Sequence, residues 1–119
     1  MIGSSTEAKP TCPEPEDIAP CKCEIGEDML ASIKCSDSSI KSGSQIKQIF
    51  DRISRNPKMV NQIFYSLTFA SSNLIQIPEN VTGQIKFQVF RFTQECENLK
   101  SIHQNAFASS VNTTSSILI

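Results

Sequence analysis

The sequence has little of what catalysis, nucleic-acid binding or membrane insertion demands. It contains one histidine and four scattered glycines, and its net charge is −1. A lone histidine leaves few options for acid–base chemistry, and scattered glycines form no phosphate-binding loop. Without a basic surplus there is no electrostatic reason to expect nucleic acid. No apolar run is long enough to cross a bilayer, so we predict no membrane span.

Cysteine, in contrast, is crowded near the start of an otherwise ordinary globular composition. Apolar residues make up 39% of the chain and charged residues 19%, which fits one domain with a modest core. Four cysteines precede residue 36, at Cys12, Cys21, Cys23 and Cys35. Zinc is the competing interpretation, but the Cys21–Cys23 pair is too tight for the usual zinc knuckle. Disulfides and an oxidising, extracellular compartment are therefore predicted, with no metal and no cofactor.

Spacing alone does not choose among the three possible connectivities of four cysteines. Side chains of a C-x-C pair point apart on an extended strand, which excludes only the direct Cys21–Cys23 bond. Cys96 is left over. We expect a buried free thiol, or one whose partner lies in a missing part of the protein. An intermolecular bond or a reactive thiol is the alternative.

The first half of the chain predicts a small hairpin followed by a helix. Two short extended segments, 21–25 and 30–35, flank the turn signal at 26–28. Apolar residues then recur at i, i+3, i+4 and i+7 from Ile46 to Ile53, which predicts an amphipathic helix over about 45–55. Ser44 is the expected N-cap, and Asn56-Pro57 is expected to end the helix.

The second half predicts a repeat. The pattern L-x-x-L-x-L occurs at Phe64–Phe69 and again twenty-three residues later at Phe87–Phe92. The segment Asn73–Asn80 recurs as Asn98–Asn105, offset by twenty-five residues, and Ile117–Ile119 would begin a third copy. Such a period, with strand, turn and buried aliphatic positions, indicates a leucine-rich-repeat solenoid. The apolar final run favours a fragment, with a signal peptide upstream and more repeats downstream.

The predicted fold class is thus an α/β repeat: a leucine-rich-repeat solenoid with a disulfide-stapled N-terminal cap hairpin and an amphipathic helix, truncated after about two repeats. Each repeat buries its apolar positions against a neighbour, so the first repeat needs a cap. We assign residues 1–11 to a disordered N-terminal segment, 12–62 to the cysteine-rich cap and 63–119 to the incomplete repeats.

The cap sequence also resembles a known group. Cys12-Pro13, Pro20–Cys23 and Cys35-Ser36 are similar to the cysteine-rich N-terminal cap of extracellular leucine-rich-repeat proteins. In that cap the first cysteine pairs with the third and the second with the fourth. The resemblance implies the disulfides Cys12–Cys23 and Cys21–Cys35.

The stretches 12–21 and 103–107 resemble, more closely, secreted arthropod repeat proteins that are similar to the non-catalytic subunit of shrimp luciferin monooxygenase. Two departures stand out. The asparagines directly precede the leucine instead of following the usual N-x-L, and the second repeat has two extra residues within 93–98. Both weaken the expectation of a regular asparagine ladder.

The function predicted from these features is a secreted, non-enzymatic module for protein binding, recognition or scaffolding. The alternative is a non-catalytic subunit that stabilises a separate enzyme, as the resemblance implies. A partner would contact the concave repeat face, formed by strand residues that alternate with buried ones. Those residues are Ser66, Thr68, Val89 and Arg91, and a solvated face without a partner is an equal alternative.

Two glycosylation motifs and the lone histidine are the remaining candidate residues. Asn80-Val81-Thr82 and Asn112-Thr113-Thr114 match the N-x-[ST] pattern, so Asn80 and Asn112 are candidate glycosylation sites. His103 lies in a predicted turn with no nucleophile placed beside it by a motif, so we assign no catalytic residue.

Overall fold

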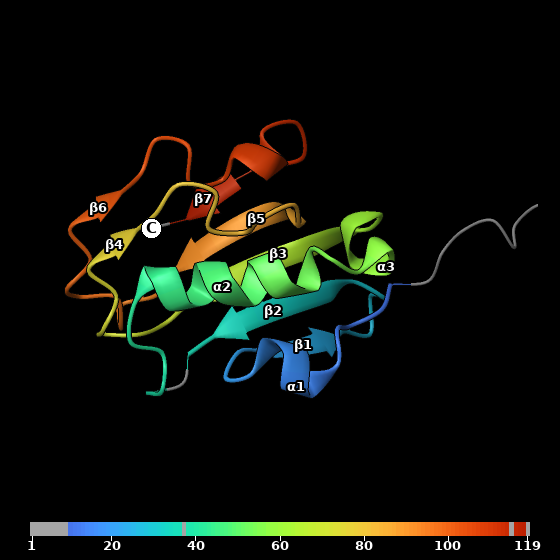
Figure 1. The fold of residues 1–119 in the computed structure, drawn as a ribbon, viewed down its shortest axis with the longest axis horizontal. Helices are drawn as coiled ribbons and strands as arrows, with labels where there is room; N and C mark the ends of the chain where they lie inside the picture. The colour runs from blue at the N-terminus through green and yellow to red at the C-terminus, as the bar shows by residue number, and fades with distance from the viewer. Residues whose placement is uncertain (1–9, 37, 115, 119) are drawn as a thin grey trace, which may run out of the picture.

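The computed structural model describes residues 10–36, 38–114 and 116–118, and places five strands in one sheet in the order β1-β2-β3-β5-β7. Two further short strands, β4 and β6, pair beside it (Figure 1). The strands of the main sheet are β1 (Lys22–Ile25), β2 (Ala31–Cys35), β3 (Ile63–Phe69), β5 (Lys86–Phe92) and β7 (Ser116–Leu118), and those of the small sheet are β4 (Gln76–Ile77) and β6 (Ser101–Ile102).

Short helices and one longer helix connect these strands. The longer helix, α2, lies across one face of the main sheet (Figure 1). The helices are α1 (Pro15–Ile18), α2 (Gly43–Ile53), α3 (Pro57–Val60) and the 3-10 helix η2 (Ala108–Ser110). Helix α1 starts on a proline, whose fixed φ suits the first helical turn.

The hairpin of the N-terminal half belongs to the same sheet as the later strands. Strands β1 and β2 are antiparallel, with Cys23 opposite Ile33. Strand β2 then pairs parallel to β3, with Ile33 beside Leu67 and Cys35 beside Phe69. Because a parallel pair needs a crossover, α2 serves as the connection between β2 and β3. The predicted boundary at residue 62/63 therefore runs between hydrogen-bonded neighbours, and residues of both parts share one core.

The two copies of the apolar strand pattern lie side by side in register. Strands β3 and β5 are parallel, and Leu67 pairs with Phe90. Phe64 lies beside Phe87, and Phe69 beside Phe92. Strand β7 continues the series, with Ile117 beside Phe90. Ile119, the last residue of the predicted third copy, lies outside the described residues.

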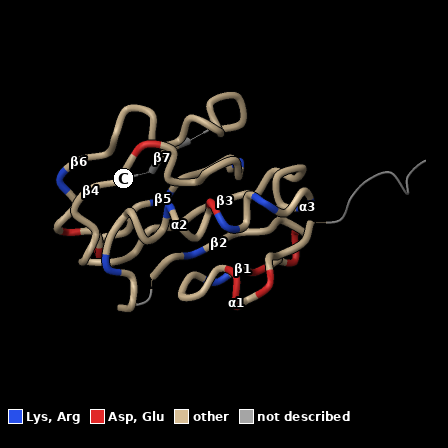
Figure 2. Tube along the Cα trace, in the orientation of Figure 1, with Lys and Arg blue, Asp and Glu red and all other residues tan. Residues whose placement is uncertain are grey.

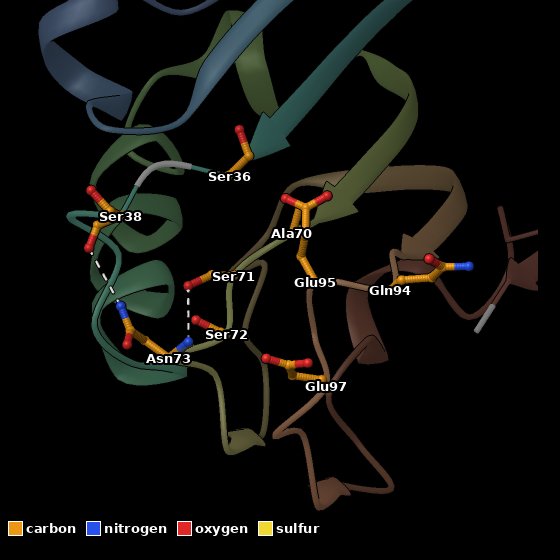
Figure 3. Close-up of a pocket in the computed structure, with 9 residues that line it drawn as sticks. All are labelled: Ser36, Ser38, Ala70, Ser71, Ser72, Asn73, Gln94, Glu95 and Glu97. Atoms are coloured by element: carbon orange, nitrogen blue, oxygen red, sulfur yellow. Dashed lines mark hydrogen bonds between the residues drawn. The ribbon is translucent and has the colours of Figure 1, made fainter.

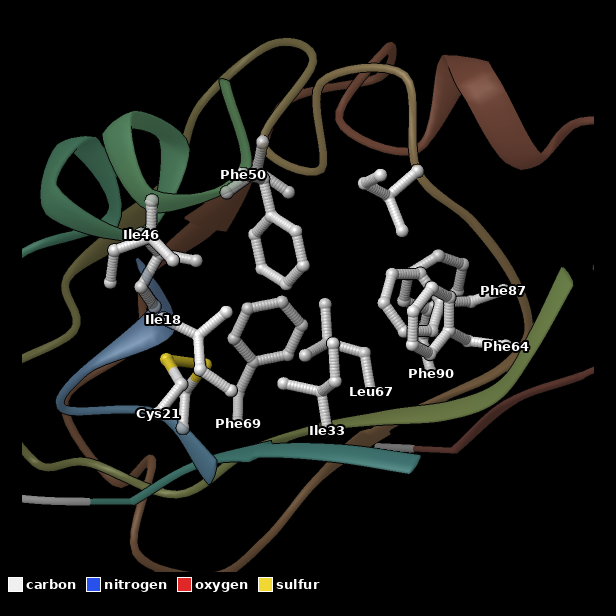
Figure 4. Packing of buried hydrophobic residues seen from close by; sticks show 14 of the residues in the cluster. Ile18, Cys21, Ile33, Ile46, Phe50, Phe64, Leu67, Phe69, Phe87 and Phe90 are labelled. Carbon is white, nitrogen blue, oxygen red and sulfur yellow. A yellow bond between two sulfur atoms is a disulfide. The ribbon is translucent and has the colours of Figure 1, made fainter. Parts of the chain in front are cut away.

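Phenylalanine rings fill the space between α2 and the sheet (Figure 4). Phe50 points from the helix toward the sheet and meets the edge of Phe87 with ring centroids 5.8 Å apart. Phe90 stacks on Phe107 at 3.9 Å. Each such pair contributes about 0.5–1.5 kcal/mol beyond its buried area, so the rings bind successive strands together.

The helix begins two residues earlier than the sequence suggests. The expected N-cap, Ser44, lies inside α2, and Ser42 takes that place because its hydroxyl accepts a hydrogen bond from the Gln45 amide at 3.2 Å. The apolar face is as expected, with Ile46, Ile49, Phe50 and Ile53 all buried. Helix α2 ends at Ile53, three residues before Asn56, and the Asn56 side chain instead caps the next helix, α3, by accepting from the Lys58 amide.

Two disulfides fix the N-terminal segment to the hairpin. Cys12 is bonded to Cys23, and Cys21 to Cys35, which is the pairing that the resemblance implies. Cys21 and Cys35 are buried in the core, 3% and 0% exposed, beside Ile18 of α1 (Figure 4). In the chain-entropy account each closed loop contributes about 3 kcal/mol. The bonds therefore hold a segment that has little core of its own.

Residues 1–9 of the segment predicted to be disordered lie outside the described residues. Thr11, at its end, is held in place: its amide donates to the Gln62 side chain at 3.0 Å, and Gln62 donates back to the Thr11 carbonyl at 2.6 Å. Thr11 is thus hydrogen-bonded to the residue directly before β3.

Two asparagines bridge successive segments despite their unusual position in the repeat. The Asn73 side chain donates to the Ile40 carbonyl at 2.9 Å, and the Asn98 side chain donates to the Ser72 carbonyl, also at 2.9 Å. Each bond runs from one turn to the turn before it. The shift of the asparagines by one place therefore does not prevent these two bonds.

Candidate functional site

The face of the sheet opposite α2 carries polar side chains in rows across the strands. Alternation along a strand sends Ile33, Leu67 and Phe90 into the core and their neighbours to the other face. Pairing then aligns Lys34, Thr68 and Arg91 in one row on β2, β3 and β5. Adjacent strands lie about 4.8 Å apart, so the two cations of this row are separated by roughly 10 Å.

A third cation extends the row onto β1. Lys22 lies opposite Lys34 on the antiparallel pair, and like charges in such a position are destabilising. Glu24 is the acidic residue on the described part of this face. Figure 2 shows acidic positions gathered around α1 and β1, and Lys and Arg positions on β2 and β5. Within the described residues the one ion pair found is Lys47–Asp51 on α2, so Lys22, Lys34 and Arg91 have no ion-pair partner there.

A shallow hollow of about 330 Å³ opens on this face, over β1, β2 and β3. Its walls combine hydroxyls with charged groups, an arrangement suited to hydrogen bonding with a polar partner. The residues that line it are Lys22, Glu24, Ser32, Ile33, Lys34, Ser36 and Thr68.

Only part of the partner face predicted from the sequence reaches solvent. Ser66 and Val89 lie side by side in register, but they are 6% and 5% exposed. Both side chains are short and lie in the interior of the sheet, Ser66 between β2 and β5 and Val89 between β3 and β7, whereas the long Arg91 side chain reaches solvent. Neither residue is available to a partner, and the accessible pair is half-buried Thr68 with exposed Arg91.

Sequence reasoning missed Lys22, Ser32 and Lys34, because it placed the hairpin in a separate cap. A signal was present. In the sequence, residues 31–35 alternate apolar and polar side chains as the ends of β3 and β5 do, and the structure buries Ile33 and Cys35. The pattern x-L-x-L therefore identifies β2 as a member of the parallel series.

A second hollow, of about 480 Å³, lies at the ends of β2, β3 and β5 (Figure 3). Serines and an asparagine form one side. The Ser71 hydroxyl there is already engaged, since it accepts from the Asn73 amide at 3.2 Å and donates to the Ile40 carbonyl. Glu95 and Glu97 form the other side (Figure 3). The hollow offers carboxylates and hydroxyls but pairs no base with a nucleophile among its lining residues.

The lone histidine and the free cysteine both have structural partners. His103 Nδ1 accepts a hydrogen bond from the Asn105 amide at 2.9 Å, which closes a turn. The half-buried Cys96 thiol donates to the Phe69 carbonyl at 3.2 Å. Across residues 10–36, 38–114 and 116–118, no three metal-ligating side chains come together.

Both candidate glycosylation sites are at the surface. Asn80 and Asn112 are exposed. Asn80 begins a turn in the left-handed region, with φ of 53°, a conformation that asparagine tolerates better than most residues. No helix in the described part of the chain has the length and apolar character needed to cross a bilayer.

These features define a disulfide-linked protein built on a mainly parallel sheet. The sheet has a polar, cationic face opposite α2 (the open face), which carries Lys22, Lys34, Thr68 and Arg91. The chain is similar to the protein named Oplophorus-luciferin 2-monooxygenase non-catalytic subunit of Oplophorus gracilirostris, with 27% identity over 108 residues. The match covers 91% of this chain and 28% of that protein, so the chain spans less than a third of the length of its relative. No protein-family model and no solved structure matches.

Proposed function

We propose that this chain is a secreted, non-enzymatic leucine-rich-repeat module that binds a protein partner through the open face of its sheet. The observation that carries the proposal is the row Lys34–Thr68–Arg91, extended by Lys22 on β1, whose cations have no ion-pair partner among the described residues. A surface with three cations and one acid favours a partner that presents acidic side chains.

The sheet's own energetics support a role for these charges. Lysines directly opposite each other on paired strands weaken the pairing by roughly 0.2–1 kcal/mol. Lys22 and Lys34 stand in this position, and neither has an ion-pair partner within the described residues. An acidic group from a partner would offset this repulsion, so binding would stabilise the pairing of β1 with β2.

The repeat character of the module rests on three regularities. Equivalent apolar positions of β3 and β5 share a register, their offset is in the twenties, and Asn73 and Asn98 bridge successive turns in the same way. The extracellular location rests on the two disulfides, since such bonds persist in oxidising compartments.

A non-catalytic subunit of a secreted enzyme is the second candidate function. It is favoured by one observation, the similarity across 91% of this chain to a protein whose name describes such a subunit. In that case the acidic partner is the enzyme itself, and the open face is the surface that holds it.

The test is a comparison of immobilised variants. The unmodified chain is exposed to the secreted proteins of the source organism, beside Lys34→Glu/Arg91→Glu. We expect one protein to be retained in stoichiometric amount by the unmodified chain, to be eluted by salt, and to bind the variant at least about tenfold more weakly, because rim charges govern such encounters.

Arg55→Glu/Lys58→Glu is the matched control, since both residues are exposed, Arg55 between α2 and α3 and Lys58 in α3, and the change in net charge is the same. Equal loss of binding in both variants would assign the effect to overall charge and overturn the proposal. Retention of the same protein by all three chains would overturn it too. An enzyme in a one-to-one complex would select the subunit function, and a non-enzymatic partner would select recognition.

A further inference from the structure

The hydroxyl of Thr82 has no structural role that the fold explains. The side chain is 0% exposed, and its Oγ1 has no hydrogen-bond partner among the described residues. A buried hydroxyl without a partner keeps the full cost of its lost hydration, so it lowers the free energy of unfolding. Valine has nearly the same shape and would avoid that cost.

The backbone groups around Thr82, unlike its hydroxyl, are hydrogen-bonded, so an irregular local backbone does not explain the missing partner. Its carbonyl accepts from the Ile85 amide at 2.9 Å, and the preceding Val81 amide donates to the Ala106 carbonyl at 3.0 Å. The turn is also closed by the Gly83 amide, which donates to the Asn80 carbonyl at 3.0 Å.

Asn80, two residues before Thr82, indicates a role for the hydroxyl before the chain folds. The two residues form the sequence Asn80-Val81-Thr82, in which glycan transfer requires the hydroxyl residue at the third place. In the folded chain Asn80 is exposed but Val81 and Thr82 are fully buried, so a transferase could not bind the three residues together.

We infer that the Thr82 hydroxyl is retained for N-glycosylation of Asn80 and acts before the turn at 80–83 folds. The donor is a polyprenyl-diphosphate-linked oligosaccharide. The Asn80 amide nitrogen forms a bond to the anomeric carbon and loses a proton, while the carbon–oxygen bond to the diphosphate breaks and the diphosphate leaves with the electron pair. The inference rests on the proposed extracellular location, because this chemistry belongs to secretion.

The other candidate site lacks this signature. In Asn112-Thr113-Thr114 the last hydroxyl donates to the Phe87 carbonyl at 3.3 Å, and the Thr113 hydroxyl donates to the same carbonyl at 3.0 Å. Hydrogen bonding in the folded state already accounts for these hydroxyls, so their presence is no evidence for a glycan at Asn112.

A glycan at Asn80 would leave the open face of the sheet free. The turn packs on the helix side: the Gln84 amide donates to the Ser54 hydroxyl at 2.9 Å, just after α2. A Cβ on Gly83 would lie 2.6 Å from the same hydroxyl oxygen. The sugar would therefore leave from the side of the sheet that carries α2, away from Lys34 and Arg91.

The first test uses the chain with a foreign signal peptide in a secreting eukaryotic line, so delivery does not depend on the native location. All variants carry Asn112→Gln, which leaves Asn80 as the site that is read. We expect a mass shift removable by peptide N-glycosidase, its loss in Thr82→Val and Asn80→Gln, and its retention in Thr82→Ser. Absence of any glycan on the Asn112→Gln chain would overturn the inference.

The second test separates the hydroxyl's role in transfer from its cost in the fold. In chains made without glycosylation and with both disulfides formed, Thr82→Val should raise the Tm by about 2–6 °C. A lower Tm would show that the hydroxyl stabilises the fold and would overturn the inference. A microsomal transferase should modify the reduced, alkylated chain but not the folded one, and equal modification of both would contradict the proposed order of events.

Discussion

The half of the molecule before β3 is held by covalent bonds, whereas the half from β3 onward is held by ring packing and by hydrogen bonds between turns. Both disulfides lie before residue 36, and six of the seven phenylalanines lie after residue 63. The two halves nevertheless share one sheet and one core.

This difference follows from the number of neighbours each strand has. Strand β3 is flanked on both sides, by β2 and β5, and repeated rings can stack from strand to strand. Strand β1 has a neighbour on one side, and most of its residues are exposed, so it buries little apolar surface. Disulfides stabilise such an edge without requiring a large core, mainly by restricting the unfolded chain.

The largest expected effect tests the ring-packed half. Phe90 is fully buried and stacks on Phe107, so Phe90→Ala should lower the free energy of unfolding by about 3–5 kcal/mol. Urea denaturation followed by circular dichroism, with disulfides intact, measures this loss. Ile75→Ala is the control, because Ile75 is 55% exposed and should change stability by less than about 0.5 kcal/mol. A loss below about 1 kcal/mol for Phe90→Ala would mean that the rings do not hold this half.

The next effect tests the covalent half. Removing the buried disulfide by Cys21→Ala/Cys35→Ala should lower the free energy of unfolding by about 3 kcal/mol. Removing Cys12–Cys23, which closes a shorter loop and is half-buried, should cost less. Both pairs are compared in a Cys96→Ala background, so that no free thiol can exchange.

The same variants show whether the halves are independent. Because β2 lies between β1 and β3 in one sheet, we expect a single unfolding transition in every variant. Two separate transitions after removal of Cys21–Cys35 would show that the N-terminal half unfolds alone, and would contradict a single cooperative core.

The register of β3 with β5 could be predicted from the sequence, because the equivalent apolar positions of the two copies face the same core only when they lie side by side. The extent of the open face could not be predicted as well. Ser66 and Val89 alternate with core residues, yet both are buried in the interior of the sheet, where β2, β3, β5 and β7 pair. Burial of that kind depends on neighbours far along the chain, which a local pattern does not contain.

The role of β2 was missed for a different reason. The hairpin pattern around Gly26 is local and predicts β1 with β2, but pairing of β2 with β3 spans more than thirty residues. The available clue was the order strand, amphipathic helix, strand, which is typical of a parallel crossover. Lys34 then joins Arg91 on one face, and the candidate site becomes visible.

The smallest expected effect concerns the helix that joins the two halves, where local sequence signals were ambiguous. Ser42 and Ser44 both precede the apolar run of α2, but only the Ser42 hydroxyl accepts from the Gln45 amide. Ser42→Ala should therefore lower the free energy of unfolding by about 1 kcal/mol, and Ser44→Ala by less than about 0.5 kcal/mol. Paired urea titrations resolve this difference. The reverse order would place the start of α2 at residue 45, and would loosen the connection through which β2 is set parallel to β3.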